Sequence, residues 1–205
     1  MADCASTFPT LARLDDAPPA SFMTTTLRTR FAALMMIGAI ASPSAFAAGA
    51  HAHGVARLDV AVDGTTITLR LESPLESLLG FERAPRNDAE RGQVRAMAQA
   101  LRSGNQFVPS AAARCRLDRV TLASPVLAPE LLGETGAATG DTAGGEHAEL
   151  EGSFVYRCDD PKALQGIDVM LFDYFKRLGR VEARVAGPKG QSASKLNSRT
   201  RQIRW

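Results

Sequence analysis

The sequence predicts an α+β fold with a largely antiparallel sheet, one longer helix and one or two short helices. Two observations support this class: strand-like alternation of apolar and polar residues recurs between turn signals, and a clear helical pattern stands among the strands. The strands do not alternate regularly with helices, as a parallel βαβ arrangement would require. No internal repeat occurs at a fixed period. Residues 48–205 are therefore expected to form a single domain.

The first expected elements are a β-hairpin and a short helical segment. Residues 55–62 and 66–72 alternate in polarity on either side of Asp63-Gly64, which is typical of two antiparallel strands joined by a turn. The second strand should end at Ser73-Pro74. Apolar residues at one-turn spacing over 75–81 then predict a short amphipathic segment.

A longer helix follows. Asn87 is a good N-cap, and Glu90 stands three residues later, as in a capping box. The apolar residues behind them recur at helical spacing up to a stop near Gly104. The expected helix has about four turns and buries Val94, Met97, Ala98 and Leu101.

Two strands on either side of a loop come next. Residues 114–122 alternate in polarity, and residues 150–158 do so again. Between them, residues 133–148 are rich in Gly, Ala and Thr, which favours a flexible surface loop. The last predicted elements are a strand at 167–171, about two helical turns at 172–178 and a hairpin that begins with a strand at 181–185.

The N-terminal part has the order of a secretory signal. Two arginines precede the apolar run 31–40, and small residues then lead to Ala45-Phe46-Ala47, an A-x-A sequence. The run is about half the roughly 20 apolar residues that a spanning helix needs, so a permanent membrane anchor is the weaker alternative. We expect residues 1–47 to be a leader with a cleavable signal peptide, with the true start at Met23. The mature protein is then periplasmic, without an integral membrane segment.

Two cysteines remain after the signal is removed, because Cys4 lies in the leader. An even pair in an exported chain predicts a disulfide between Cys115 and Cys158. In the chain-entropy model such a ring stabilises the folded state by about 4 kcal/mol. The alternative is two separate buried thiols.

Charge is distributed unevenly along the chain. Residues 176–205 carry nine basic side chains against Glu182 alone, whereas residues 48–175 carry 12 basic and 18 acidic side chains. The cationic C-terminal segment is expected to be a solvated, partly frayed end, or alternatively to engage an acidic partner. Export and the lack of interleaved aromatic residues argue against nucleic acid as that partner.

Three histidines are candidate metal ligands. In extended backbone His51 and His53 project from the same side, so both imidazoles could reach one ion. Zinc binds imidazole nitrogen readily, usually in a set of four ligands. His147, flanked by Glu146 and Glu149, would be a third ligand if the loop folds back toward the N-terminus. The alternative is three solvated histidines without a shared role.

Six short motifs follow one another along the chain: His51–Gly54, Leu71–Pro74, Gly80–Pro85, a cysteine before a variable loop, His147 leading to Tyr156–Cys158, and Asp168–Phe172. In this order they resemble the ZrgA-like family of periplasmic zinc-binding proteins, over about residues 51–196. The resemblance implies a non-enzymatic protein that binds zinc through histidines. It also implies a partner, a zinc uptake system of the inner membrane, for which the protein buffers or delivers the ion.

One position departs from the family pattern. Many members have a histidine where this chain has Arg83, and a guanidinium offers only donors and cannot ligate a metal. The site would then consist of His51, His53 and His147, with Glu82, Glu146 or water in the fourth position. Arg83 is expected to modify the site by its charge.

The sequence gives little support to catalysis. Ser192–Lys195 matches S-x-x-K, but the S-D-N and K-T-G segments that accompany it in enzymes are absent. A second class remains open beside metal binding. In it the protein is an envelope interaction module whose metal site is degenerate and whose cationic C-terminal segment binds an acidic partner.

Overall fold

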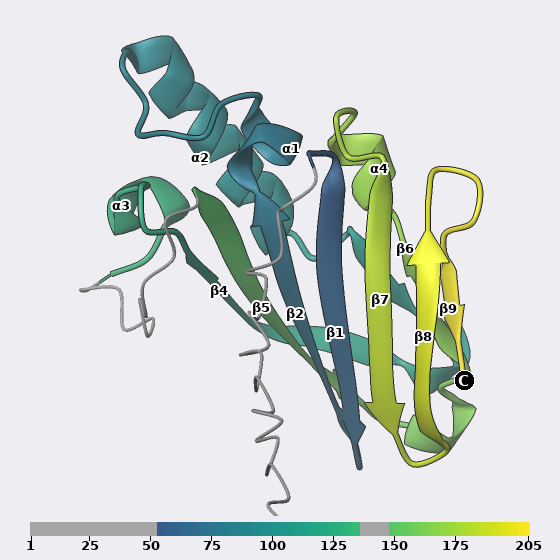
Figure 1. The fold of residues 1–205 in the computed structure, drawn as a ribbon. Helices are drawn as coiled ribbons and strands as arrows, with labels where there is room; N and C mark the ends of the chain where they lie inside the picture. Colours follow the sequence, from purple (N-terminus) through teal and green to yellow (C-terminus); the bar gives the residue numbers. More distant parts are fainter. Residues whose placement is uncertain (1–52, 136–147) are drawn as a thin grey trace, which may run out of the picture. The chain divides into compact units, whose positions relative to one another are not determined.

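The computed structural model describes residues 53–135 and 148–205. These residues form a six-stranded sheet, a three-stranded sheet and four α-helices (Figure 1). The large sheet has the order β4-β5-β2-β1-β7-β8, and its pairs are antiparallel except β1 with β7. This confirms the α+β class with a largely antiparallel sheet. The strands of the large sheet are β1 (Val55–Asp63), β2 (Thr66–Pro74), β4 (Cys115–Ala123), β5 (Glu149–Cys158), β7 (Arg180–Gly187) and β8 (Gly190–Leu196).

The predicted hairpin of β1 and β2 is confirmed, and its turn depends on a glycine. Asp63 pairs with Thr66, so the connection has two residues. Gly64 begins it with a φ of 54°, a backbone conformation that costs glycine nothing and strains other residues.

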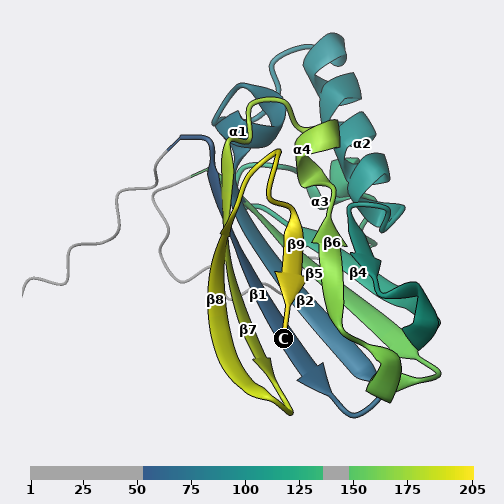
Figure 2. The ribbon, with the colours of Figure 1, turned by 90° about the vertical axis from the view of Figure 1, so that its right-hand side faces the viewer.

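Helices and the small sheet cover one face of the large sheet (Figure 2). The small sheet has the order β3-β6-β9. Its strands are β3 (Phe107–Pro109), β6 (Gly166–Val169) and β9 (Gln202–Arg204), and the helices are α1 (Leu75–Leu79), α2 (Asp88–Arg102), α3 (Pro129–Leu132) and α4 (Leu171–Tyr174). Short 3₁₀ turns lie at Ala111–Ala113 and Pro161–Ala163.

Helix α2 matches its prediction closely. The Asn87 side chain accepts a hydrogen bond of 2.9 Å from the Glu90 N–H, which satisfies one of the free donors at the helix start. The four residues predicted to be buried are the four that the helix buries: Val94, Met97, Ala98 and Leu101. Gly104, just beyond the helix, has a φ of 69°, as expected of a residue that ends a helix.

The core lies between the large sheet and the layer that covers it. Leu58, Ile67 and Leu69 from the sheet are fully buried, and each such side chain stabilises the fold by about 2 kcal/mol. Phe107 of β3 and Phe154 of β5 meet edge to face, with ring centroids 4.8 Å apart. This contact joins the two sheets.

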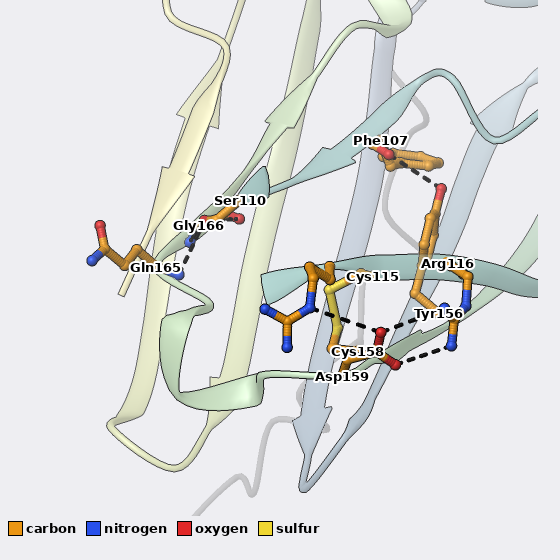
Figure 3. Close-up of a disulfide and its surroundings, with 10 residues drawn as sticks. Phe107, Ser110, Cys115, Arg116, Tyr156, Cys158, Asp159, Gln165 and Gly166 are labelled. Carbon is orange, nitrogen blue, oxygen red and sulfur yellow. Dashed lines mark hydrogen bonds and ion pairs between the residues drawn. A yellow bond between two sulfur atoms is a disulfide. The ribbon is translucent and has the colours of Figure 1, made fainter. Parts of the chain in front are cut away.

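The predicted disulfide is present. Cys115 and Cys158 are directly opposite each other in the β4–β5 pair, and their sulfur atoms are bonded at 2.03 Å (Figure 3). The bond links the two strands that precede and follow the predicted loop at 133–148. Most of that loop, residues 136–147, lies outside the described residues.

Three expectations about the later part of the chain were wrong. The strand predicted to reach residue 171 ends at Val169, because Leu171 already belongs to α4. The helix expected over two turns has a single turn, Leu171–Tyr174. The cationic C-terminal segment is not frayed, because it forms β7, β8 and β9 and buries Ile203 completely. Within the described residues, no helix is long and apolar enough to cross a membrane.

Candidate metal site

One end of the large sheet gathers three chain segments. Strands β1 and β5 begin there, and β2, which lies between them, ends there. His53 stands two residues before β1, and His147 stands two residues before β5. Antiparallel pairing through β2 thus brings the starts of two segments far apart in sequence to one edge, about 10 Å from each other across two strand spacings.

The backbone of Gly54, the residue after His53, is held by hydrogen bonds to α1 and to the start of β7. The Gly54 N–H donates to the Ser77 hydroxyl in α1 at 3.0 Å. The Gly54 carbonyl accepts from the N–H groups of Gly179 and Arg180, at 2.8 and 2.9 Å. Gly54 has a φ of 77°, and a Cβ there would lie 3.2 Å from the Arg177 carbonyl oxygen. A glycine is therefore needed to present His53 at this position.

His53 faces two carboxylates. Its Nδ1 lies 3.7 Å from Glu82 Oε1 and 3.8 Å from Glu76 Oε2. The imidazole is 70% exposed, so it is open to solvent and to an incoming ion. Imidazole nitrogen and carboxylate oxygen are both zinc ligands.

Glu76 was not among the predicted site residues. The hairpin register pairs Arg57 with Glu72, so residues before the start of β1 lie near residues after the end of β2, in α1. The predicted hairpin therefore indicated that His53 lies near the short helical segment, but not which of its side chains faces His53. Glu76 also has a cationic neighbour, because Arg177 Nη1 lies 3.8 Å from its Oε1.

The described residues hold only part of the predicted ligand set. His51, His147 and Glu146 lie outside them. Among the described residues, no group of three histidine, cysteine, aspartate or glutamate side chains is arranged to hold a metal ion. His53, Glu76 and Glu82 lie near one another, but by themselves they do not form such a group.

Both flanks of the segment that contains His147 are fixed at the same end of the sheet. Before it, the Glu134 carboxylate binds the Arg102 guanidinium and accepts the Leu122 N–H at 2.7 Å. After it, the Ala148 carbonyl accepts the Leu75 N–H, the first of α1, at 2.9 Å. The residue that follows His147 is thus held beside the helix that carries Glu76.

Arg83 is bound to a carboxylate rather than free. Its two terminal nitrogens donate to the two oxygens of Glu90 at 2.7 and 2.8 Å, and its guanidinium stacks 5.0 Å from the centroid of the Phe81 ring. Glu90 also accepts the Arg86 N–H at 2.7 Å. These hydrogen bonds, with that from Arg83 the largest cause, hold the pKa of Glu90 down at about 2.

The fold and the cluster of His53, Glu76 and Glu82 define a class: an α+β protein with an exposed histidine beside two carboxylates at one end of a largely antiparallel sheet. Residues 50–205 match the family described as ZrgA family zinc uptake protein. The chain belongs to this family, which gives it a zinc-related role. No curated protein matches the chain in a sequence comparison.

Proposed function

We propose that this protein is a non-enzymatic, exported zinc carrier that binds the ion at the His53 end of the sheet and buffers it or delivers it to an uptake system of the inner membrane. The ligands are His51, His53 and His147, with Glu76 or Glu82 completing the coordination. The observation that carries the proposal is that β1 and β5 begin at the same end of the large sheet. A histidine stands two residues before each of these strands.

Distance supports one shared ion. An imidazole nitrogen binds zinc at about 2.0–2.1 Å, and side chains from strand starts about 10 Å apart can converge on a point between them. The Glu82 carboxylate lowers the local potential, and Glu76 does so less because Arg177 lies 3.8 Å from it, which together favour a divalent cation. Within this account, Arg83 contributes little repulsion because Glu90 neutralises it.

Export is part of the proposal. The signal is removed near Ala47, so the mature protein begins near Ala48 and keeps His51 and His53. The disulfide agrees with an oxidising compartment such as the periplasm. The intact mass of the exported protein measures the cleavage point, and a start beyond His53 would remove two ligands and contradict the metal site.

Zinc titration by calorimetry tests the function. The exported protein, with any affinity tag removed, is expected to bind one zinc ion with micromolar or tighter affinity. His53→Ala should weaken binding by about 100-fold or more, because two imidazoles remain of three. Glu76→Gln and Glu82→Gln should each weaken it less, and Glu151→Gln, an exposed carboxylate of β5, is the matched control that should leave it unchanged.

Two results would contradict the proposal. One is no heat beyond dilution in the parent, which would favour the interaction module with a degenerate site. The other is a His53→Ala protein that binds zinc as tightly as the parent. In that case the ion would be held elsewhere.

A further inference from the structure

The second face of the large sheet has no described element over it. In Figure 2, the described helices and the small sheet lie on one side only. The residues of the central strands that alternate with the buried ones point to the other side and are exposed or partly exposed. Most of these outward residues on β2, β1 and β7 are charged. The way in which strand pairing aligns these charges is regular.

Strand register places six charges in two parallel rows across β2, β1 and β7. Row one consists of Glu72, Arg57 and Glu182, and row two consists of Arg70, Asp59 and Arg184. The rows are two residues apart along each strand, about 7 Å. Row one has the charge order minus, plus, minus, and row two has the opposite order. Each row is therefore the electrostatic complement of the other.

The charges of the two rows are weakly paired within the chain. In row one, Arg57 Nη1 is 4.0 Å from Glu72 Oε2, and Glu182 Oε1 is 3.5 Å from Arg180 Nε; these four side chains are all about half exposed. In row two, the three side chains are exposed and form no ion pair with any described residue. Beside row two, small residues such as Ala61 and Ala186 leave a hollow of about 600 Å³ in the face.

We propose that this face binds a second copy of the same chain, in a symmetric dimer in which row one of each copy lies on row two of the other. A two-fold axis in the plane of the interface, perpendicular to the strands and midway between the rows, produces this arrangement. Arg70 then faces the partner's Glu72, Asp59 faces the partner's Arg57, and Arg184 faces the partner's Glu182. Symmetry repeats the three contacts, as in any isologous interface.

The charge pattern also excludes the other symmetric arrangement. A two-fold axis parallel to the strands would lay row one on itself and bring Arg57 against the partner's Arg57. It would also bring Glu72 against the partner's Glu182, and in row two it would oppose Arg70 and Arg184. Like charges in contact are strongly unfavourable at an interface. Complementarity therefore selects one of the two orientations.

The size of the face suits a weak, salt-sensitive dimer. Six strands about 4.8 Å apart and about seven residues long cover about 650 Å² in each copy, and about 1,300 Å² in total lies at the lower end of specific interfaces. Packed sheets whose strands are nearly aligned form stable sandwiches. We expect dissociation constants of about 1–100 µM at low salt, rising at least tenfold in 0.5 M NaCl as screening weakens the charge contacts.

Sedimentation equilibrium of protein purified from cells that express the full chain tests the dimer. The parent should be dimeric at about 200 µM and low salt. Arg70→Glu/Arg184→Glu and Glu72→Arg/Glu182→Arg should each be monomeric, because each places like charges in four contacts. Mixing these two variants should restore association, since row one of each then complements row two of the other. Circular dichroism verifies that both variants are folded.

A matched control keeps the same change in net charge away from the face. Arg95→Glu/Arg199→Glu alters two exposed arginines of α2 and of the loop after β8, and it should remain dimeric. A parent that stays monomeric at 200 µM would overturn the proposal and leave the face to another partner. So would dimers of Arg70→Glu/Arg184→Glu as tight as those of the parent, or a mixture of the two variants that fails to associate.

Discussion

The two ends of strand β5 differ in how the chain is held. At its end, Cys158 is bonded to Cys115, and the hydroxyl of the nearby Tyr156 donates to the Phe107 carbonyl at 3.2 Å (Figure 3). The same buried hydroxyl donates to the Gly104 carbonyl at 2.9 Å. At its start, the nearby imidazole of His53 is 70% exposed and its carboxylate neighbours stay beyond hydrogen-bond distance. One end is closed by a covalent bond, and at the other the imidazole of His53 is open to solvent.

This difference suggests a division of roles along the same strands. The disulfide end fixes the register of β4 and β5, and register determines what lies at the opposite end, because a slip by one residue would turn every side chain to the other face. The candidate metal end can then keep its side chains exposed without losing their relative positions. Loss of the disulfide should therefore lower the free energy of unfolding, whereas substitutions at the His53 end should mainly lower zinc affinity.

The largest effect on stability is expected from the disulfide. Cys115→Ser and Cys158→Ser should each lower the free energy of unfolding by about 4 kcal/mol, since each opens the same ring. The double variant should be no worse than either single one, because the two residues share one interaction. Urea unfolding measures all three, and reduction of the parent should bring it close to the variants. Two titratable thiols in freshly exported protein would refute the disulfide.

A smaller loss is expected from the buried phenol beside it. Tyr156→Phe removes the donor to the carbonyls of Gly104 and Phe107, and we expect a loss of about 1–2 kcal/mol. Burial also raises the pKa of Tyr156 to about 12. The unfolded chain loses this proton near pH 10, so the parent should lose stability from about pH 10 to 12. Tyr156→Phe should lack that loss. If the free energy of unfolding falls by the same amount in both proteins between about pH 10 and 12, the phenol is not buried.

A still smaller effect on stability is expected from Arg83, the residue that follows Glu82. Arg83→Ala should lower the thermal midpoint by less than Tyr156→Phe does, because the Arg83–Glu90 pair lies near solvent. The pKa of Glu90 is depressed to about 2, so its contribution is present above about pH 4.5 and is lost as the pH falls toward 2. The difference between parent and variant should disappear over that window.

The same position separates two interpretations of the metal site. If Arg83 repels the ion, Arg83→His should raise zinc affinity tenfold or more by removing a charge and adding a nitrogen. Because the guanidinium is held by Glu90, we expect zinc affinity to stay within about twofold, as for charges already compensated. Calorimetric titration of parent and variant decides between the two.

Local signals predicted the regular elements well. The hairpin, the Asn87-capped helix and the cysteine pair each follow from patterns within a few residues or from a count, and the structure confirms them. The second sheet did not follow from local patterns. Its strands β3 and β9 have three residues each, too short for alternation to show, and they form because Phe107 and Ile203 are buried by distant parts of the chain.

In the C-terminal segment and at the candidate site, too, local patterns did not show which distant parts of the chain pair with each other. The nine basic residues of this segment suggested a solvated end. Two of them, Arg180 and Arg184, instead alternate with buried residues such as Val181 in β7, and the pairing of β7 with β1 determines their place. At the candidate site, His53 was predicted from its chemistry, whereas the position of Glu76 beside it depends on the pairing of β1 with β2. Residue type indicates what a side chain can bind, and tertiary pairing determines which side chains meet.

Zinc K-edge X-ray absorption of the zinc-loaded, tag-free protein tests whether histidines bind the ion, because it reports the ligands themselves. We expect three imidazole nitrogens at about 2.0–2.1 Å, with oxygen completing the coordination. The imidazole scattering should fall by one ligand in His53→Ala protein loaded at high zinc. A spectrum with oxygen ligands alone, or one that His53→Ala leaves unchanged, would show that His53 does not bind the zinc ion.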